Sequence, residues 1–175
     1  MTRVSIVAAA TALTSFAISA CSTSTMSEGA GPKQSFGLMA GDGTPRGTVT
    51  LHEKGVQATL AAMAAGMPPG PHGLHLHEKG LCDGPAFTSA GGHWNPTARK
   101  HGRDNPAGPH LGDLPNLEIA ASGQGTATFS VASASEMADA DGTALVVHAK
   151  ADDYRTDPSG NSGDRIACAV IAAPR

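Results

Sequence analysis

The sequence predicts an all-β domain, an antiparallel sandwich or barrel that carries two long loops. Short apolar stretches alternate with turn residues, and the chain contains 22 glycines and 12 prolines. Helical periodicity is scarce, whereas short strands with frequent turn signals are typical of these folds. Residues 78–116 and 149–164 are too long and irregular for hairpin turns. Long ordered loops in a compact domain are usually functional, so we expect the site there.

Eight segments have the apolar alternation of short strands, and Gly, Pro and Asn separate them. They are residues 35–39, 48–52, 56–62, 73–77, 117–120, 126–131, 144–148 and 165–171. The stretch EMADADGT, residues 136–143, is predicted to hold a short helical turn. No repeat of fixed period is found. We therefore expect one domain that extends from residue 34 to residue 175.

The first twenty residues have the pattern of an export signal. Arg3 is followed by an uncharged apolar stretch, residues 4–20, that ends in small residues. This stretch is short for the alternative, a membrane-spanning anchor. ISAC, residues 18–21, resembles the lipobox of bacterial lipoproteins, in which the cysteine is lipidated and begins the mature chain. The resemblance implies a signal peptide at 1–20, a lipid on Cys21 and, because Ser22 follows, an outer-membrane lipoprotein that faces the periplasm.

Residues 22–33, STSTMSEGAGPK, have no hydrophobic period and are predicted to form a flexible tether behind the lipidated cysteine. The formal net charge of the chain is −3 and no run of basic residues occurs. This composition argues against a nucleic-acid partner. Contact with a membrane is expected only through the N-terminal lipid.

Cysteine use agrees with export. If Cys21 carries lipid, Cys82 and Cys168 remain, and a pair in an oxidising compartment is most simply a disulfide. Two separate buried thiols are the alternative.

Histidines and one aspartate gather in three segments of the chain. They are His75 and His77 in PHGLHLHE, then His93, His101, His110 and Asp113 in the first long loop, and His148 after an apolar strand. On a strand, two residues at i and i+2 project from the same face. Seven ligands exceed the four of one tetrahedral ion, but two metals that share a ligand would use them all. Imidazoles with one carboxylate favour zinc and copper over calcium or magnesium.

Six motifs in order together resemble the copper–zinc superoxide dismutases: HGLHLHE, AGGHWNP, RKHG, HLGDLPN, LVVHAKADD and GNSGDRIAC. The resemblance extends from about Gly37 to Ile171, and the cysteine in HEKGLC is similar to the bacterial branch. It implies an eight-stranded Greek-key sandwich or barrel. It also implies dismutation of superoxide to oxygen and hydrogen peroxide, which would protect the cell envelope. Members of the family are monomers or dimers, so a homodimer is possible.

Carried over position by position, the resemblance implies one copper and one zinc per subunit. Copper would be held by His75, His77, His93 and His148, and zinc by His93, His101, His110 and Asp113, with the His93 imidazolate as the bridge. Asp152 matches a carboxylate that hydrogen-bonds histidines of both metals, and Arg165 matches the arginine that attracts superoxide. Cys82 and Cys168 match the family disulfide, and His72 matches a structural histidine.

The sequence departs from the family pattern at three places. Asp164 precedes Arg165 where a small uncharged residue is expected, Ala169 replaces a glycine, and Trp94 stands where Phe or Tyr is common. None of these changes removes a ligand.

Two other functions are compatible with a histidine-rich site. A zinc hydrolase needs a general base beside an open zinc position. Glu78, next to His77, would point to the opposite strand face, and Asp113 would be used as a ligand. A copper or zinc carrier is the second alternative, but copper carriers favour Met or Cys ligands. None of the six methionines lies in the histidine motifs.

Overall fold

The computed structural model describes residues 1, 32–54, 57–131 and 134–175. Eight strands are present among them: β1 (Lys33–Ala40), β2 (Pro45–Lys54), β3 (Gln57–Ala64), β4 (Gly70–His77), β5 (Asp113–Ile119), β6 (Gly125–Val131), β7 (Thr143–His148) and β8 (Arg165–Ala172). Two short helices complete the described elements, the 3-10 turn η1 (Thr88–Ala90) and α1 (Ala134–Met137). Apart from Met1, the predicted signal peptide lies outside the described residues, as do Cys21, most of the tether and residue 56.

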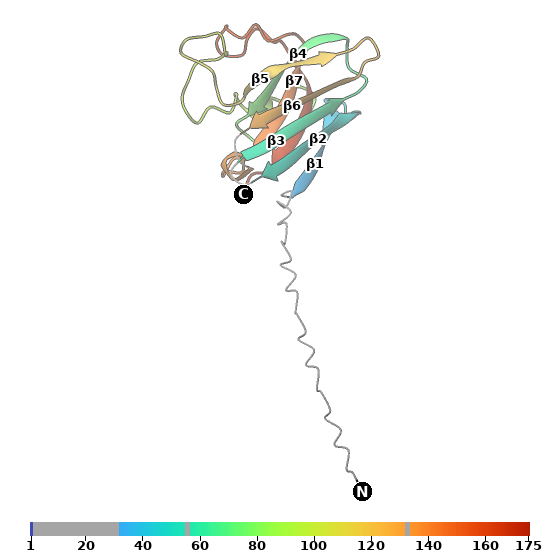
Figure 1. Cartoon of the computed structure of the whole chain (residues 1–175). Coiled ribbons are helices and arrows are strands. Elements are labelled where there is room, and N and C mark those ends of the chain that lie inside the picture. Colours follow the sequence, from blue (N-terminus) through green and yellow to red (C-terminus); the bar gives the residue numbers. More distant parts are fainter. Residues whose placement is uncertain (2–31, 55–56, 132–133) are drawn as a thin grey trace.

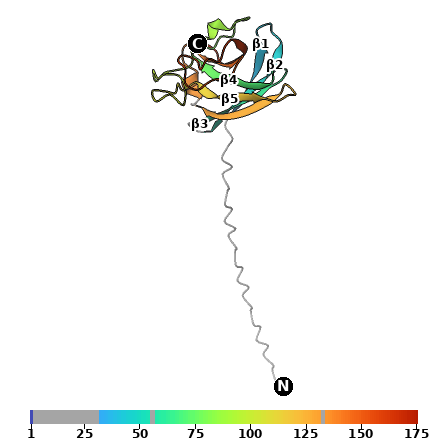
Figure 2. The ribbon, with the colours of Figure 1, turned by 90° about the horizontal axis from the view of Figure 1, so that it is seen from above.

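The strands form one antiparallel sheet in the order β5-β4-β7-β8-β1-β2-β3-β6. The sheet curls until its edge strands β5 and β6 lie against each other, so the barrel is nearly closed (Figures 1 and 2). The connections from β3 to β4 and from β6 to β7 pass over other strands, whereas β1, β2 and β3 follow one another as a meander. The predicted eight-stranded antiparallel Greek-key barrel is therefore confirmed.

The interior of the barrel is filled by alternate residues of the strands. In β2, Val49 and Leu51 are buried, whereas the exposed Thr48 lies on the outer face. In β4, Leu74 and Leu76 belong to the same interior cluster. This alternation is what places the intervening residues of each strand on the outside of the barrel.

A second apolar cluster lies between the first long loop and the outer face of the sheet. Phe87 and Ala90 of the loop pack with Ala144 and Val146 of β7, which explains why β7 is buried on both faces. The disulfide between Cys82 and Cys168 joins the same loop to β8, with Cα atoms 5.8 Å apart. The predicted pairing of these cysteines is thus confirmed.

β5 begins at Asp113, four residues earlier than expected, so the first long loop spans residues 78–112. Pro115 in β5 cannot donate to a ladder, so a strand through DLPN would be disfavoured in the middle of a sheet. β5 is an edge strand, and the register of β4 against it shifts opposite this proline, so Pro115 is tolerated. At the other end, β5 stops at Ile119, one residue before the predicted end.

Smaller differences concern two other elements. The helical turn lies at Ala134–Met137 rather than over residues 136–143. The side chain of Asp139 accepts hydrogen bonds from the amides of Asp141 and Gly142, and this turn ends the helical conformation. β1 starts at Lys33, one residue before the predicted start of the domain. The second long loop occupies residues 149–164 as predicted, between β7 and β8.

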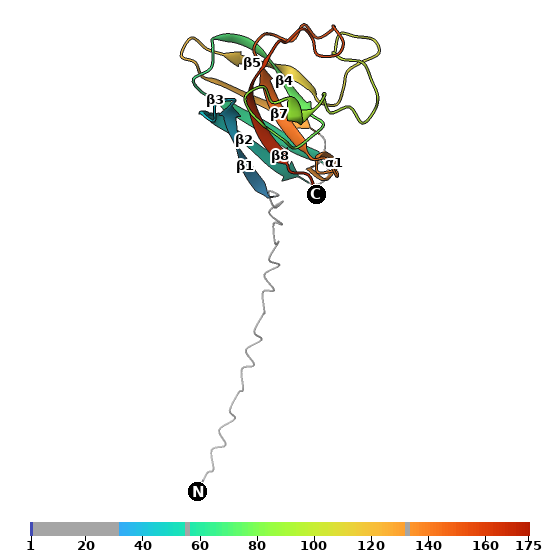
Figure 3. The ribbon, with the colours of Figure 1, turned by 180° about the vertical axis from the view of Figure 1, so that it is seen from behind.

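The two long loops cover the same end of the barrel, and α1 and the C-terminus lie at the opposite end (Figures 1 and 3). Among the described helices, none has the length and apolar character needed to cross a bilayer.

Candidate metal centre

Strands β4 and β7 supply three of the predicted copper ligands. His75 and His77 alternate with the core residues of β4, so their side chains leave the barrel interior and lie beneath the long loops. His148 ends β7, the neighbour of β4 in the sheet. All three histidines are buried.

His93 joins this group from the first long loop through a backbone bridge with His77. The rings of His93 and His75 are tilted by 32° with centroids 4.0 Å apart. Each of the four residues His75, His77, His93 and His148 offers a ligand atom within 4.8 Å of the others.

Four ring nitrogens of these residues have no hydrogen-bond partner. They are Nδ1 of His75 and Nε2 of His77, His93 and His148, and no other buried side-chain nitrogen or oxygen of the described residues lacks a partner. Unpartnered buried polar atoms are rare in native proteins. One copper ion held by four imidazole nitrogens would satisfy all of them, and this donor set suits copper.

The predicted zinc ligands converge on a second point. Oδ1 of Asp113 lies 2.9 Å from Nδ1 of His93, 3.0 Å from Nδ1 of His101 and 3.1 Å from Nδ1 of His110. Nδ1 of His110 and His93 are 3.4 Å apart. Ligands of a tetrahedral zinc ion at ordinary bond lengths are about 3.3 Å from one another. The four atoms therefore fit zinc, and His93 faces one set with Nδ1 and the other with Nε2.

His75 also lies close to the second set, because its ligand atom is within 4.8 Å of those of His93, His101 and Asp113. Its Nε2, however, is 2.9 Å from Oδ2 of Asp152, and its Nδ1 is one of the four unpartnered nitrogens. We therefore assign His110 rather than His75 to the zinc set.

Burial keeps the copper-side histidines neutral. Desolvation lowers the pKa of His75 to about 3 and that of His148 to about 4, and it holds the pKa of His77 well below its ordinary value. A histidine must be neutral to bind a metal ion. These nitrogens are therefore available to copper at neutral pH.

His101 behaves differently. Burial by itself lowers its pKa, but hydrogen bonds to Asp113 and Asp152 outweigh burial and raise the pKa to about 9. For Asp113 and Asp152 burial acts in the raising direction, yet the bonds from the histidines hold both pKa values well below the usual range. A zinc ion at this set would therefore have to displace a proton from His101, and its binding would depend on pH.

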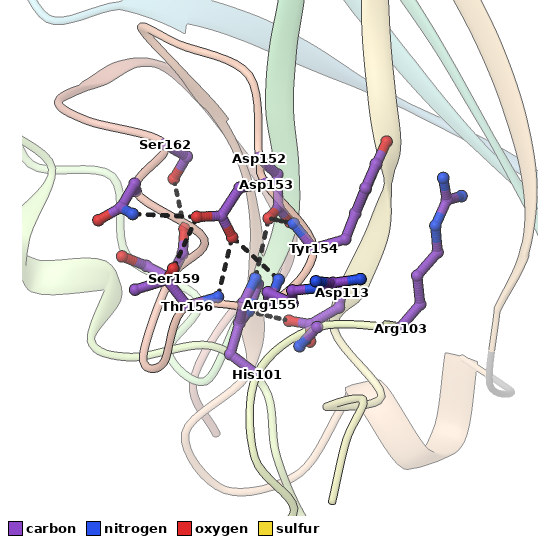
Figure 4. A network of polar contacts seen from close by, with 12 residues as sticks. His101, Arg103, Asp113, Asp152, Asp153, Tyr154, Arg155, Thr156, Ser159 and Ser162 are labelled. Carbon is purple, nitrogen blue, oxygen red and sulfur yellow. Dashed lines mark hydrogen bonds and ion pairs between the residues drawn. The ribbon is translucent and has the colours of Figure 1, made fainter. Parts of the chain in front are cut away.

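Asp152 links the two sets. Its Oδ2 faces Nε2 of His75. Its Oδ1 lies 3.0 Å from Nε2 of His101 and accepts a hydrogen bond from the amide of Tyr154 (Figure 4). Gly160 packs against this carboxylate so closely that a Cβ there would lie 1.7 Å from Oδ1. Carboxylates in this position fix the ring orientation and tautomer of metal-binding histidines.

Arg165 lies at the opening of the copper set. Its guanidinium donates hydrogen bonds to the carbonyls of Phe87 and Gly91, both 2.7 Å long, and remains half-buried. A cavity of about 240 Å³ is lined by His77, Gly92, His93, His148, Pro158, Ser159, Gly163 and Arg165. A larger hollow of about 460 Å³ lies near α1 and is lined by residues that include Phe36 and Met137. None of the histidines lines it.

The remaining predicted features lie outside both metal sets. His72 is buried and packs with its ring nitrogens 2.7 and 2.8 Å from the carbonyls of His148 and Pro68, which suits the structural role implied for it. Trp94 and Ala169 belong to the barrel core. Sequence reasoning gave no role to Gly160, the first residue of the motif GNSGDRIAC, nor to Tyr154, whose hydroxyl accepts a hydrogen bond from the amide of Asn116. Gly160 has a positive φ, which a glycine in a motif can indicate, but its close approach to Asp152 is visible only in the structure.

Comparisons with known proteins agree with this geometry. The family model of copper/zinc superoxide dismutase (SODC) matches residues 45–171. A Superoxide dismutase [Cu-Zn] of Caulobacter vibrioides is 41% identical over 143 residues, which cover 77% of this chain and 82% of that protein. Superoxide dismutase [Cu-Zn] 2 of Aquifex aeolicus is 39% identical over 142 residues, which cover 77% and 83%.

Two solved structures are also similar. A SOD-like protein from Bacillus subtilis has a TM-score of 0.74 and 37% identity, with 78% of this chain and 97% of that chain covered. A Cu/Zn superoxide dismutase from Brucella abortus has a TM-score of 0.67 and 29% identity, with 80% and 99% covered. The fold, the two sets of converging ligand atoms and these matches give one conclusion: the chain belongs to the copper/zinc superoxide dismutase family.

Proposed function

We propose that this protein dismutates superoxide, with copper held by His75, His77, His93 and His148 and zinc held by His93, His101, His110 and Asp113. The observation that carries the proposal is the set of four unpartnered buried nitrogens. Beside it lies a second set of ligand atoms, in which three histidine nitrogens surround an oxygen of Asp113. The proposal rests on these ligand atoms and not on the fold, because function is determined by the site. In this chain all the nitrogens that copper needs are present.

Bound copper supplies one-electron chemistry, through which two superoxide ions and two protons become one oxygen and one hydrogen peroxide. Arg165 places a positive charge at the cavity, where it attracts and orients an anion. His93 commits Nδ1 to the zinc set, so Nε2 is the atom at which it can accept and give up a proton. Zinc has no redox chemistry, and its role is to hold His93 and the first long loop.

An assay on the purified protein tests the function directly. The chain loaded with copper and zinc is expected to show a visible d–d band and to remove superoxide in a cyanide-sensitive way. Hydrolysis by the zinc form alone would favour the hydrolase, although the Glu78 carboxylate is engaged by the amide of Gly92. A visible band without superoxide removal would favour a metal carrier.

Export and lipidation form a separate proposal about location. The lipobox ISAC and the single cysteine beyond the disulfide pair support an outer-membrane lipoprotein that faces the periplasm and protects the envelope. Several acyl chains on one residue would hold a protein on a membrane, whereas a single chain would not.

The Cys21→Ser variant tests this anchor. We expect the variant to leave the membrane fraction or to remain unprocessed. Its superoxide removal per bound copper should be unchanged, because residue 21 is far in sequence from the candidate metal ligands. Fractionation and mass spectrometry of the mature N-terminus measure both effects. A variant that is cleaved normally and stays in the membrane fraction would exclude lipid as the anchor.

Asp164 offers a test of electrostatic attraction. It is exposed beside Arg165, where its negative charge opposes an approaching anion. A unit charge about 7 Å from the path in a water-like dielectric contributes about 0.6 kcal/mol, or roughly threefold in rate. We expect Asp164→Ser to raise kcat/KM by about that factor at low ionic strength and hardly at all at high ionic strength. Identical rates for variant and wild type at low salt would contradict the effect.

A further inference from the structure

The two long loops contact each other on either side of His101, one of the proposed zinc ligands. Residues 100–104 belong to the first long loop, and Asp152, Tyr154 and Asp157 of the second long loop contact them. We call the contacts made by Tyr154 and Asp157 the inter-loop clamp.

Asp157 forms one half of the clamp. Its Oδ1 accepts a 2.8 Å hydrogen bond from the backbone amide of His101, and its Oδ2 lies 2.9 Å from Nζ of Lys100. The lysine side chain is 63% exposed and that of the aspartate is 38% exposed. An exposed ion pair of this kind contributes little. A hydrogen bond from an amide to a carboxylate is charge-assisted and stronger, so the contact to His101 is the important one.

Tyr154 forms the other half. Its carbonyl accepts a 3.0 Å hydrogen bond from the amide of Asp104, and the guanidinium of Arg103 lies 3.8 Å above its ring (Figure 4). Its hydroxyl accepts a 2.8 Å hydrogen bond from the amide of Asn116 in β5. Gly102 lies so close that a Cβ there would be 2.1 Å from the Tyr154 carbonyl oxygen.

The clamp fixes the part of His101 that its metal-facing partners do not reach. Asp113 and Asp152 hold the two ring nitrogens of His101, whereas Asp157 holds its backbone amide. A ligand fixed at both the ring and the main chain cannot swing away when it loses one bond to the metal. Its departure then requires the two long loops to separate.

We propose that Asp157 is a positioning residue that slows the loss of zinc by holding the backbone of His101, and that Tyr154 supports it by holding the loops together. This inference rests on the proposed zinc site. It assigns a role to residues that touch neither the metal nor the substrate.

The experiment compares variants of the full chain loaded with copper and zinc. Asp157→Ala removes both contacts, Lys100→Ala removes the ion pair alone, and Asp157→Asn keeps an oxygen for the His101 amide. Asp104→Ala is the matched control, because Asp104 is an exposed aspartate of the same loop whose carboxylate lies only near Arg103, at 4.0 Å. The readouts are the rate of zinc release to a chromogenic chelator and the hydrogen exchange of the His101 amide.

We expect Asp157→Ala to release zinc about tenfold faster, in the range found when partners of metal ligands are removed. The His101 amide should exchange faster in the same variant. Lys100→Ala and Asp104→Ala should stay near the wild-type rate on both readouts. Asp157→Asn should lie between the wild type and Asp157→Ala, because its hydrogen bond to the His101 amide is no longer charge-assisted. If Asp157→Ala does not fold, Arg103→Ala takes its place, because it removes the contact between the first long loop and the Tyr154 ring, and it should speed zinc release.

Wild-type zinc release in Asp157→Ala would overturn the proposal, as would an equal acceleration in Lys100→Ala or Asp104→Ala. If Arg103→Ala is the variant measured, wild-type release there overturns it. A wild-type protein that binds no zinc would count against the proposed function instead. In that case the hydrogen exchange of the His101 amide is measured in the metal-free protein. Equal exchange rates in wild type and Asp157→Ala would show that Asp157 does not hold the backbone of His101.

Discussion

Replacing His93 with alanine is expected to remove both metals from the protein and to abolish superoxide removal. His93 contributes Nε2 to the set of unpartnered nitrogens and Nδ1 to the cluster around Asp113. Its loss leaves three ligands on each side and no link between the two sets. The loss of activity should be complete within the sensitivity of the assay, because the redox metal is gone. Metal analysis of the purified variant measures copper and zinc directly.

His77→Ala is the matched comparison for this variant. His77 supplies a copper-side nitrogen through Nε2, while its Nδ1 lies 3.0 Å from the carbonyl of Gly91, away from the zinc set. We expect this variant to lose copper and retain zinc. Full occupancy of both metals in His93→Ala would show that His93 is not the bridge. Loss of zinc in His77→Ala would show that the two sets are not separate.

The barrel was predictable because its strands obey a simple alternation. In β4, Leu74 and Leu76 fill the core, while His75 and His77 lie on the other face, and this pattern is visible in the residue types. The start of β5 was not predictable in the same way. Pro115 reads as a strand breaker unless one knows that the strand is at the sheet edge, which is a property of the whole fold.

The convergence of the candidate ligands was predictable for a chemical reason, since imidazoles and a carboxylate at fixed intervals are typical of metal sites. The residues that hold them in place were predictable only in part. Asp152 is found through its resemblance to the family pattern. Asp157 acts on a backbone amide, and Tyr154 acts through its own carbonyl and hydroxyl, so neither contact depends on a recognisable pair of side chains.

Replacing Gly160 with alanine is expected to weaken zinc binding about 10- to 100-fold without altering a ligand. Gly160 has a φ of +64°, and an added Cβ would lie 1.7 Å from Oδ1 of Asp152 and 2.7 Å from Nε2 of His101. The carboxylate must move, because the glycine backbone is fixed by hydrogen bonds to Thr156 and Asp153. Its hydrogen bond to His101 is then lost, and the ring is no longer oriented. Competition with a chelator measures the affinity for zinc.

Gly43→Ala separates this effect from ordinary backbone strain. Gly43 has a φ of +83°, so alanine there carries a similar left-handed penalty of about 1–2 kcal/mol, but no atom lies within 4 Å of the added Cβ. Both variants should therefore unfold at a lower temperature, and only Gly160→Ala should release zinc more readily. Equal zinc affinity in the two variants would mean that the Asp152 carboxylate can leave His101 without consequence. The orientation of His101 would then depend on Asp113 and on its backbone contact with Asp157 alone.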